Sequence, residues 1–342
     1  MIGVGTPLMW MLFAAFVVVA LAVDFLAMNK QGAHKVTMGE AATWSLIWVA
    51  VSFVFVALLW WYLGGVSGNE AERGIGNDKA LAFTTGYLVE KALAVDNIFV
   101  FLMVFTYFSV PAEFQKRVLM FGILGALVLR AVMIFAGAWL IARFDWVLYI
   151  FGAFLVFTGV KMWWAAGQEP DLESNPALKW IRKHMRIAPA LDGEKFFTVV
   201  DGVKLATPLF VVILLIGVVD VVFAVDSIPA IFAITTDPFI VLTSNVFAIL
   251  GLRAMYFLLA GLHEKFHLLT YGLAIVLILI GAKMLLVDVY HVPVSWSLAA
   301  TVAVLAVTMV LSLYIPAGGY TGSAYPFKAK HGKEGNPTRK RN

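Results

Sequence analysis

Long apolar stretches separated by shorter polar ones dominate the chain. Each stretch is close to or above the ~20 residues that a helix needs to cross the hydrocarbon core of a bilayer. Because the core offers no water to the backbone, a spanning segment has to satisfy its own hydrogen bonds, which favours helices. The pattern predicts an all-α polytopic membrane helix bundle with about nine transmembrane helices, near 7–28, 41–63, 80–108, 118–142, 146–166, 206–234, 239–262, 268–287 and 294–315.

The amino-acid composition agrees with a polytopic membrane protein. Of the 342 residues, 62% are hydrophobic and only 13% are charged, which is too apolar for a soluble domain of this length. The chain has no cysteine, so disulfides, thiolate metal sites and cysteine nucleophiles are excluded. A bound metal would therefore use oxygen or imidazole ligands. The N-terminal run lacks the features of a cleaved signal peptide, so we expect a retained first span.

Lys and Arg residues are distributed unevenly between the two sides of the predicted membrane. The side that contains segment 167–205 and the C-terminal tail carries 17 of them, against 3 on the other side. Cytoplasmic segments carry such an excess of positive charge. We therefore expect a protein of the bacterial inner membrane with its N-terminus outside and its C-terminus in the cytoplasm.

Segment 167–205 is expected to form two small cytoplasmic elements. A basic helix should begin near Asn175, with Trp180 and Ile181 touching the membrane interface. A β-hairpin should turn at Asp-Gly, where Gly202 is the second residue, because this dipeptide is typical of type I′ turns.

Recurring motifs indicate an internal duplication. The stretch EKALAVDN, which begins at Glu90, is echoed by DVVFAVDS, which begins at Asp220. LRA and Gly-x-Lys-Met then recur in the same order in both halves. These matches define two units of three spans each, 80–166 and 206–287. Because the segment between them stays in the cytoplasm, we expect the units to be inverted repeats.

The other parts of the chain flank these two units. Residues 1–79 are expected to form two peripheral N-terminal transmembrane helices, and residues 288–315 the last transmembrane helix. Residues 316–342 are rich in Gly, Pro and Lys, which predicts a disordered cytoplasmic tail.

Four acids lie deep in the third and sixth predicted spans, where an ionised group costs about 2.5–3.5 kcal/mol to insert. They are Glu90, Asp96, Asp220 and Asp226. Candidate charge partners in neighbouring spans are Arg130, Arg253 and, unless it points elsewhere, Lys91. The acids outnumber these cations, and such a surplus suits a divalent cation. The alternative is that all four acids only pair with Arg and Lys to hold the helices together.

Asn97 and Ser227, each next to the second acid of its motif, add further oxygen atoms. The candidate metal-ligating residues are therefore Glu90, Asp96, Asn97, Asp220, Asp226 and Ser227. An oxygen-rich set favours hard ions such as Mg²⁺, Ca²⁺ or Mn²⁺ without choosing among them. Residues six apart on a helix point about 120° apart, so one motif cannot supply both ligands. We expect Asp96 and Asp226 to lie together across the pseudo-two-fold axis. Glu90 and Asp220 would then form an adjacent binding site or neutralise the arginines.

The segment His263–His267 matches H-E-x-x-H, a pattern that places two zinc-binding imidazoles on one helix face. It lies in the short turn between two predicted spans and has no following ligand motif, so we interpret it as a solvated turn. We do not expect an enzyme, although a membrane metalloprotease stays as a remote alternative.

The segments TGYLVEKALAVDNIFVF, DVVFAVDSIPAIFAITTDPF and YGLAIVLILIGAKML resemble the TerC membrane family, closest to its Alx branch, among transporters of the LysE type. The family is associated with manganese export, metal and tellurite resistance, and alkaline response. The resemblance implies Mn²⁺ efflux through the six candidate ligands. The family pattern has a glutamate three residues before Asp220, where this chain has Gly217. Its absence removes one potential ligand or proton carrier.

Our leading hypothesis is a secondary transporter that exports Mn²⁺ through carboxylates near the membrane midplane by alternating access of the inverted repeats. Because carboxylates bind metal when deprotonated, binding should weaken on acidification. The alternative is a non-transport membrane scaffold or a sensor of metal or pH stress. The expected partners are a divalent metal ion and the lipid bilayer. We expect no organic cofactor and no nucleic acid. Whether the protein forms a homo-oligomer is left open.

Overall fold

The computed structural model describes residues 3–31, 36–66, 68–144, 146–166, 175–200, 202–260, 268–290 and 292–315, without the side chains of 27–31, Asp96 and Phe99. This part of the chain is mostly helical and holds one β-hairpin. The elements are α1 Pro7–Gln31, α2 Met38–Tyr62, α3 Glu70–Tyr107, α4 Ala112–Arg143, α5 Val147–Ala165, α6 Pro176–His184, β1 Phe197–Val200, β2 Val203–Ala206, α7 Pro208–Phe232, α8 Pro238–Leu250, α9 Leu252–Ala260, α10 Leu269–Leu285 and α11 Val294–Tyr314.

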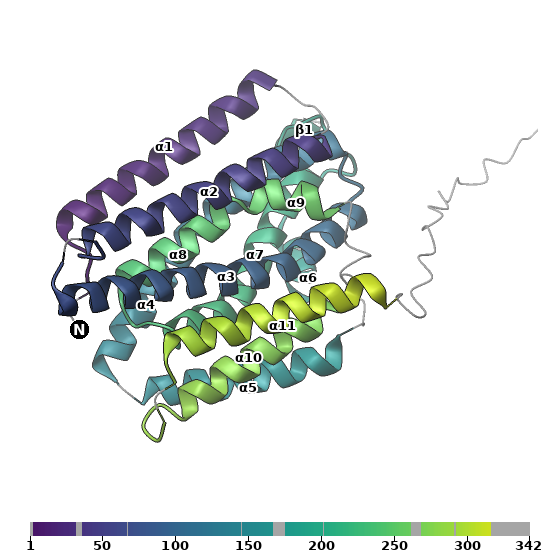
Figure 1. Cartoon of the computed structure of the whole chain (residues 1–342). Helices are drawn as coiled ribbons and strands as arrows, with labels where there is room; N and C mark the ends of the chain where they lie inside the picture. The colour runs from purple at the N-terminus through teal and green to yellow at the C-terminus, as the bar shows by residue number, and fades with distance from the viewer. Residues whose placement is uncertain are drawn as a thin grey trace, which may run out of the picture.

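The long helices run side by side in one bundle (Figure 1). Helices α1 and α2 lie at one side, and α5, α10 and α11 lie at the other. Between them, α3 packs against α7 and α8, and α4 packs against α7. The buried core consists mainly of apolar residues from these central helices. Large apolar side chains are also exposed on α1, α2, α4 and α11, as expected for surfaces that face lipid.

Six described helices are long and apolar enough to cross a membrane: α1, α2, α4, α5, α7 and α11. The pair α8 and α9, bent by 43°, would make a seventh as one broken span. Helices also occupy the other two predicted ranges, but α10 is shorter and α3 is not among the candidates. The structure therefore agrees with a polytopic helical membrane protein and leaves the predicted number of nine as an expectation.

The long helix α3 carries the first acidic motif and begins with a capping box. The Asn69 side chain accepts a hydrogen bond from the backbone of Glu72, and the Glu72 carboxylate accepts one from the backbone of Asn69. Such reciprocal bonds satisfy two backbone donors that the helix itself leaves unpaired. Near the same end of the bundle, Lys79 of α3 forms an ion pair of 2.8 Å with buried Asp237, the N-cap of α8.

Helices α5 and α10 approach each other closely through small residues. An added Cβ at Gly159 would lie 2.8 Å from the carbonyl oxygen of Ala274. At Gly281 it would lie 2.7 Å from the carbonyl oxygen of Gly152. The earlier residue of α5, Gly152, thus lies against Gly281, and the later one, Gly159, lies against Ala274. The two helices therefore run antiparallel. Small residues allow such close backbone approach in membrane bundles.

The segment before α7 contains the predicted basic helix and hairpin. The Asn175 side chain caps α6 by accepting hydrogen bonds from its first backbone N–H groups. Strands β1 and β2 are antiparallel, with Val200 paired to Val203, and Gly202 has a left-handed φ of 76°. Trp180 is exposed, but Ile181 is buried against the bundle, so its expected contact with the membrane interface is wrong. The predicted disordered tail lies outside the described residues.

The α5–α10 crossing predicts that Gly159→Ala destabilises the protein. The new methyl group would collide with backbone atoms of α10, and overpacking of this kind costs about 1–3 kcal/mol. Gly125→Ala is the matched control, because a Cβ there meets nothing within 4 Å and alanine favours a helix by up to about 1 kcal/mol. Thermal unfolding of both variants in detergent measures the difference. Equal unfolding temperatures would contradict the close approach.

Candidate functional site

Arg130 of α4 lies at the centre of a buried polar cluster. Its Nη2 donates to Asp220 Oδ1 at 2.9 Å and its Nε donates to Asp220 Oδ2 at 3.2 Å. Its Nη1 forms an ion pair with Glu90. The exposed fractions of Arg130, Glu90 and Asp220 are 2%, 0% and 2%. One guanidinium thus joins the first acid of the motif on α3 to the first acid of the motif on α7.

Two uncharged residues complete this cluster. Asn245 of α8 donates from Nδ2 to Glu90 at 3.1 Å, and Arg130 Nη1 lies 3.4 Å from its Oδ1. The same Nη1 lies 3.3 Å from Ser227 Oγ on α7. Four helices therefore meet at one guanidinium, which fixes how α3, α4, α7 and α8 are rotated toward one another.

The central cluster is negatively charged. Glu90 and Asp220 contribute two negative charges, and Arg130 contributes one positive charge. The predicted partner Lys91 has no hydrogen bond to Glu90 or Asp220 among the described contacts, and its Nζ donates to the carbonyl of Ala248 at 2.9 Å. Buried charges are costly unless they are compensated and hydrogen-bonded. The surplus negative charge is the feature that a bound cation would neutralise.

The first acid and the last residue of each motif share a helix face. Glu90 and Asn97 are seven residues apart on α3, as are Asp220 and Ser227 on α7, and seven residues correspond to a rotation of only about 20° from a full number of turns. All four side chains are buried. Asn97 Oδ1 has no hydrogen-bond partner among the described residues. This buried oxygen is a free acceptor on the face that carries Glu90.

The second aspartates lie on different faces from this cluster. Asp226 is partly buried and accepts a hydrogen bond of 3.1 Å from Thr158 of α5. The side chain of Asp96 lies outside the described residues, although its backbone belongs to α3. The expected meeting of Asp96 with Asp226 therefore stays a prediction.

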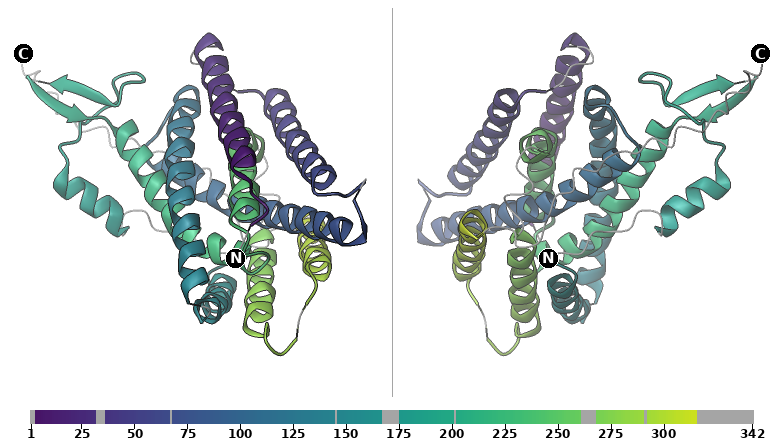
Figure 2. Two further views of the ribbon diagram at one scale, coloured as in Figure 1. Left: turned by 90° about the vertical axis from the view of Figure 1, so that its left-hand side faces the viewer. Right: turned by 90° about the vertical axis from the view of Figure 1, so that its right-hand side faces the viewer.

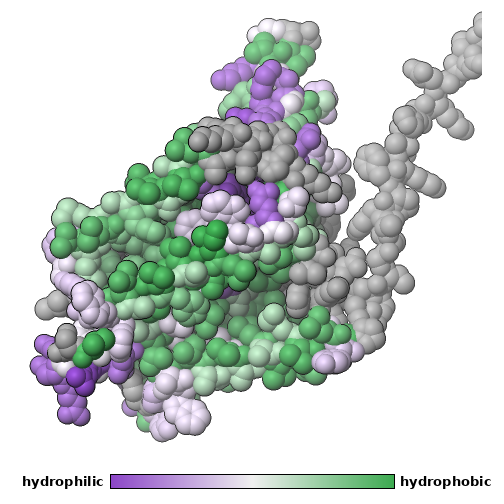
Figure 3. Space-filling view, turned by 45° about the horizontal axis from the view of Figure 1, so that its top comes forward, coloured by the Kyte–Doolittle hydropathy of each residue, from purple (hydrophilic) through white to green (hydrophobic). Residues whose placement is uncertain are grey.

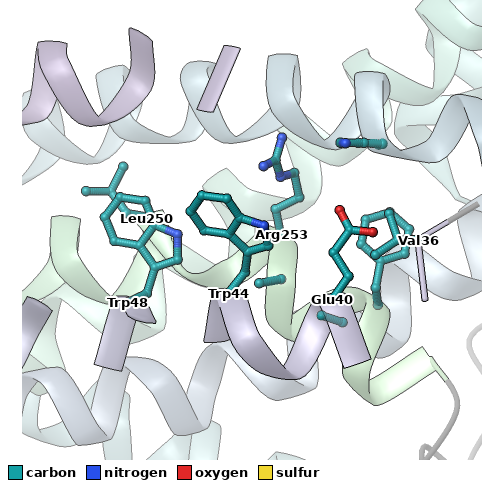
Figure 4. Close-up of a pocket in the computed structure, with 10 residues that line it drawn as sticks. Val36, Glu40, Trp44, Trp48, Leu250 and Arg253 are labelled. Atoms are coloured by element: carbon teal, nitrogen blue, oxygen red, sulfur yellow. The ribbon is translucent and has the colours of Figure 1, made fainter. Parts of the chain in front are cut away.

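Arg253, the counterpart of Arg130 in the second unit, does not reach the central cluster. It forms an ion pair with Asp24 of α1, and its Nη1 is buried without a partner among the described residues. It lines a pocket of about 20 Å³, with room for about one water. Figure 4 shows Trp44 and Glu40 of α2 on the other side of this pocket. The two repeated arginines thus occupy different surroundings.

Sequence reasoning missed Asn245, Thr158 and the pairing of Asp24 with Arg253. The run Thr243-Ser244-Asn245 is a signal for the first, because three consecutive polar residues interrupt an apolar stretch. The pairing of Asp24 depends on how α1 packs, which the sequence pattern does not show.

No metal-binding cluster of three or more His, Cys, Asp or Glu side chains occurs among the described residues. The segment His263–His267 lies outside those residues. Gly217 of α7 faces open space, since a Cβ there would meet no atom within 4 Å. The residues that the structure does bring together are Glu90, Asp220, Ser227, Arg130 and Asn245.

Comparisons with known proteins agree on one group of membrane proteins. The family model described as "Integral membrane protein TerC family" matches residues 75–318. The Escherichia coli (strain K12) protein named "Putative membrane-bound redox modulator Alx" is 56% identical over 312 residues, covering 91% of this chain and 96% of that protein. A Myxococcus xanthus protein named "Uncharacterized membrane protein STKORF319" is 47% identical over 311 residues, covering 91% and 93%. No solved structure matches this chain.

The central cluster predicts a large effect of Arg130→Gln on stability. The variant leaves Glu90 and Asp220 buried without their common partner, which costs about 3–5 kcal/mol. Thermal unfolding in detergent should show a strong loss, while Arg143→Gln at the exposed end of α4 should change stability by less than about 0.5 kcal/mol. Adding Asp220→Asn to Arg130→Gln should restore part of the loss, because it removes one uncompensated charge. A double variant no more stable than the single one would contradict this electrostatic account.

Proposed function

The chain belongs to the TerC family of integral membrane proteins, and we propose that it exports a divalent metal ion, Mn²⁺, across the bacterial inner membrane. The ion is the substrate, and the acidic motifs of α3 and α7 provide its path. The chain contains no nucleotide-binding motif, so coupling to protons or to the membrane potential is the expected source of energy. No enzymatic step is part of this proposal.

The surplus of buried negative charge carries the proposal. Glu90 and Asp220 share the one guanidinium of Arg130, while Arg253 pairs with Asp24 and Lys91 donates to a backbone carbonyl. A cluster whose only task was to hold helices together would be close to neutral, since uncompensated buried charge is expensive. A passing divalent cation would relieve this excess, and the unpaired Oδ1 of Asn97, on the helix face that carries Glu90, is a further oxygen acceptor.

The ligand chemistry favours a hard cation. Carboxylate, amide and hydroxyl oxygens suit Mg²⁺, Ca²⁺ and Mn²⁺, and the resemblance to the TerC family selects Mn²⁺ among them. Asp226 is a suitable ligand, because its described contact is a single hydrogen bond from Thr158 rather than an ion pair. Asp96 is its counterpart in the first motif.

We propose that α3, the bent pair α8–α9 and α10 also cross the membrane, which gives nine spans and two inverted units. The antiparallel α5–α10 crossing supports this arrangement. Gly159 corresponds to Gly281, and Gly152 to Ala274, in the two aligned units. Gly159 contacts Ala274, and the two residues that correspond to them, Gly281 and Gly152, contact each other as well. A pseudo-two-fold axis between the units requires such a pair of equivalent contacts. The N-terminus would then lie outside and the C-terminus in the cytoplasm.

Two other functions remain as alternatives. The first is a membrane scaffold or a sensor of metal or pH stress. The second follows the name of the Alx relatives, a membrane-bound redox modulator, and in this chain it would have to work without thiols because there is no cysteine. A membrane metalloprotease at His263–His267 is more remote. Neither the scaffold nor the redox role requires an excess of buried carboxylates.

Metal flux into proteoliposomes tests the proposal. Asp226→Asn should reduce Mn²⁺ transport by roughly ten-fold or more, as expected for loss of a ligand. The asparagine can still accept the hydrogen bond of Thr158, so the variant should fold normally. Glu113→Gln, which neutralises an exposed acid at the start of α4, is the matched control. No Mn²⁺ flux with wild-type protein, or equal flux in all three proteins, would refute the assignment.

Position 217 gives a separate prediction about affinity. Gly217→Glu places a third acid on α7, three residues before Asp220 and close to its helix face. The open space around this position leaves room for it. The variant should lower the Mn²⁺ concentration needed for half-maximal flux, whereas Gly217→Gln, which has the same size without the charge, should do so less. If the two variants need the same Mn²⁺ concentration for half-maximal flux, the added charge does not affect binding of the ion.

A further inference from the structure

The β1–β2 hairpin is fixed firmly to two central helices at its base. Phe196 packs on Phe121 of α4, with ring centroids 5.2 Å apart, and the Arg117 guanidinium lies 5.1 Å from the Phe196 ring. Arg117 also forms an ion pair of 2.7 Å with Glu194. These contacts hold the hairpin in a defined direction relative to the bundle.

The hairpin ends just before α7 begins. Strand β2 ends at Ala206, and only Thr207 separates it from α7. Phe197 packs on Phe210 in the first turn of α7, with centroids 4.6 Å apart. From this point the hairpin projects sideways, away from the bundle (Figure 2). It therefore leaves the bundle at the start of α7.

The end of the hairpin is apolar and uncovered. The exposed fractions of Val199, Val200 and Val203 are 66%, 42% and 40%. In Figure 3 the hairpin forms the projection at the top, with hydrophobic residues near its end and hydrophilic residues below them. Neighbouring strand residues point to opposite faces, so the valines make both faces of the tip apolar. Such an exposed apolar end indicates a binding surface.

The segment that contains this apolar tip has an excess of positive charge. Segment 175–206 carries six Lys and Arg residues and three acids. Two of the acids form ion pairs, Asp192 with Lys195 and Glu194 with Arg117. Exposed Trp180 lies on α6 between Lys179 and Lys183, which are also exposed. Tryptophan and basic residues beside an apolar surface are typical of protein segments that lie on anionic lipid.

We propose that α6 and the β1–β2 hairpin form a platform that docks on anionic phospholipids of the leaflet next to the start of α7. The basic residues contact the headgroups, and the valine tip enters the boundary between headgroups and acyl chains. The sideways direction of the hairpin and the excess of positive charge favour a lipid surface over a protein partner. This platform does not depend on which ion the protein moves, or on whether it moves one.

A single-cysteine probe tests the platform in the full-length protein. Because the chain has no cysteine, Val199→Cys allows a polarity-sensitive fluorophore to be attached at one place. The labelled protein is reconstituted in nanodiscs of phosphatidylcholine alone or with added phosphatidylglycerol. With phosphatidylglycerol we expect emission at shorter wavelength and stronger quenching by spin-labelled lipid. High salt should reduce both effects, because it screens exposed charges.

Charge variants in the same background provide the control. Lys179→Gln/Lys183→Gln should weaken the response to phosphatidylglycerol, whereas Arg73→Gln/Arg143→Gln, which removes the same charge elsewhere, should leave it unchanged. Emission that is the same in both lipid compositions, whether it indicates water or lipid, would overturn the proposal. Equal loss of the response in both pairs of variants would also overturn it, since the charge of α6 would then have no special role.

Discussion

The contact of Arg130 with two buried carboxylates sets the geometry of the centre of this protein. A guanidinium has a planar, fixed set of donors, and here they serve Asp220 on one edge and Glu90 on the other. Because each carboxylate would be very costly without its partner, α3, α4 and α7 cannot rotate independently. Asn245 adds α8 to the same arrangement. Asp226 lies on one of the helices that this contact orients, and the backbone of Asp96 belongs to another.

The two repeated motifs are used unequally around this contact. Ser227 of the second motif lies near the guanidinium, whereas its counterpart Asn97 in the first motif retains an unpaired oxygen. The second arginine, Arg253, would restore the symmetry, but it pairs with Asp24 of the first helix instead. The centre therefore has one cation where exact duplication would give two. Because of this difference, Glu90 and Asp220 share a single guanidinium.

The β1–β2 hairpin is connected physically to the same helices. Its base contacts Arg117 and Phe121 of α4, the helix that carries Arg130 further along. On the other side, β2 continues almost directly into α7, which carries Asp220. A force or charge acting on the hairpin would therefore reach the two helices joined by the central ion pair. The hairpin and the buried cluster therefore share α4 and α7.

The sequence by itself determined the helices and the polar residues that lie within them. Long apolar runs have few alternatives to helices, so helices occupy all nine predicted ranges, and the Asp-Gly turn placed the hairpin. The duplicated acids were visible because carboxylates are rare in such runs. Only the tertiary structure decided the partners. Arg130 and Arg253 share one motif, yet Arg130 reaches Glu90 and Asp220 while Arg253 reaches Asp24. The reason is that contacts between distant segments depend on how each helix is rotated and packed, and a local pattern does not contain that information.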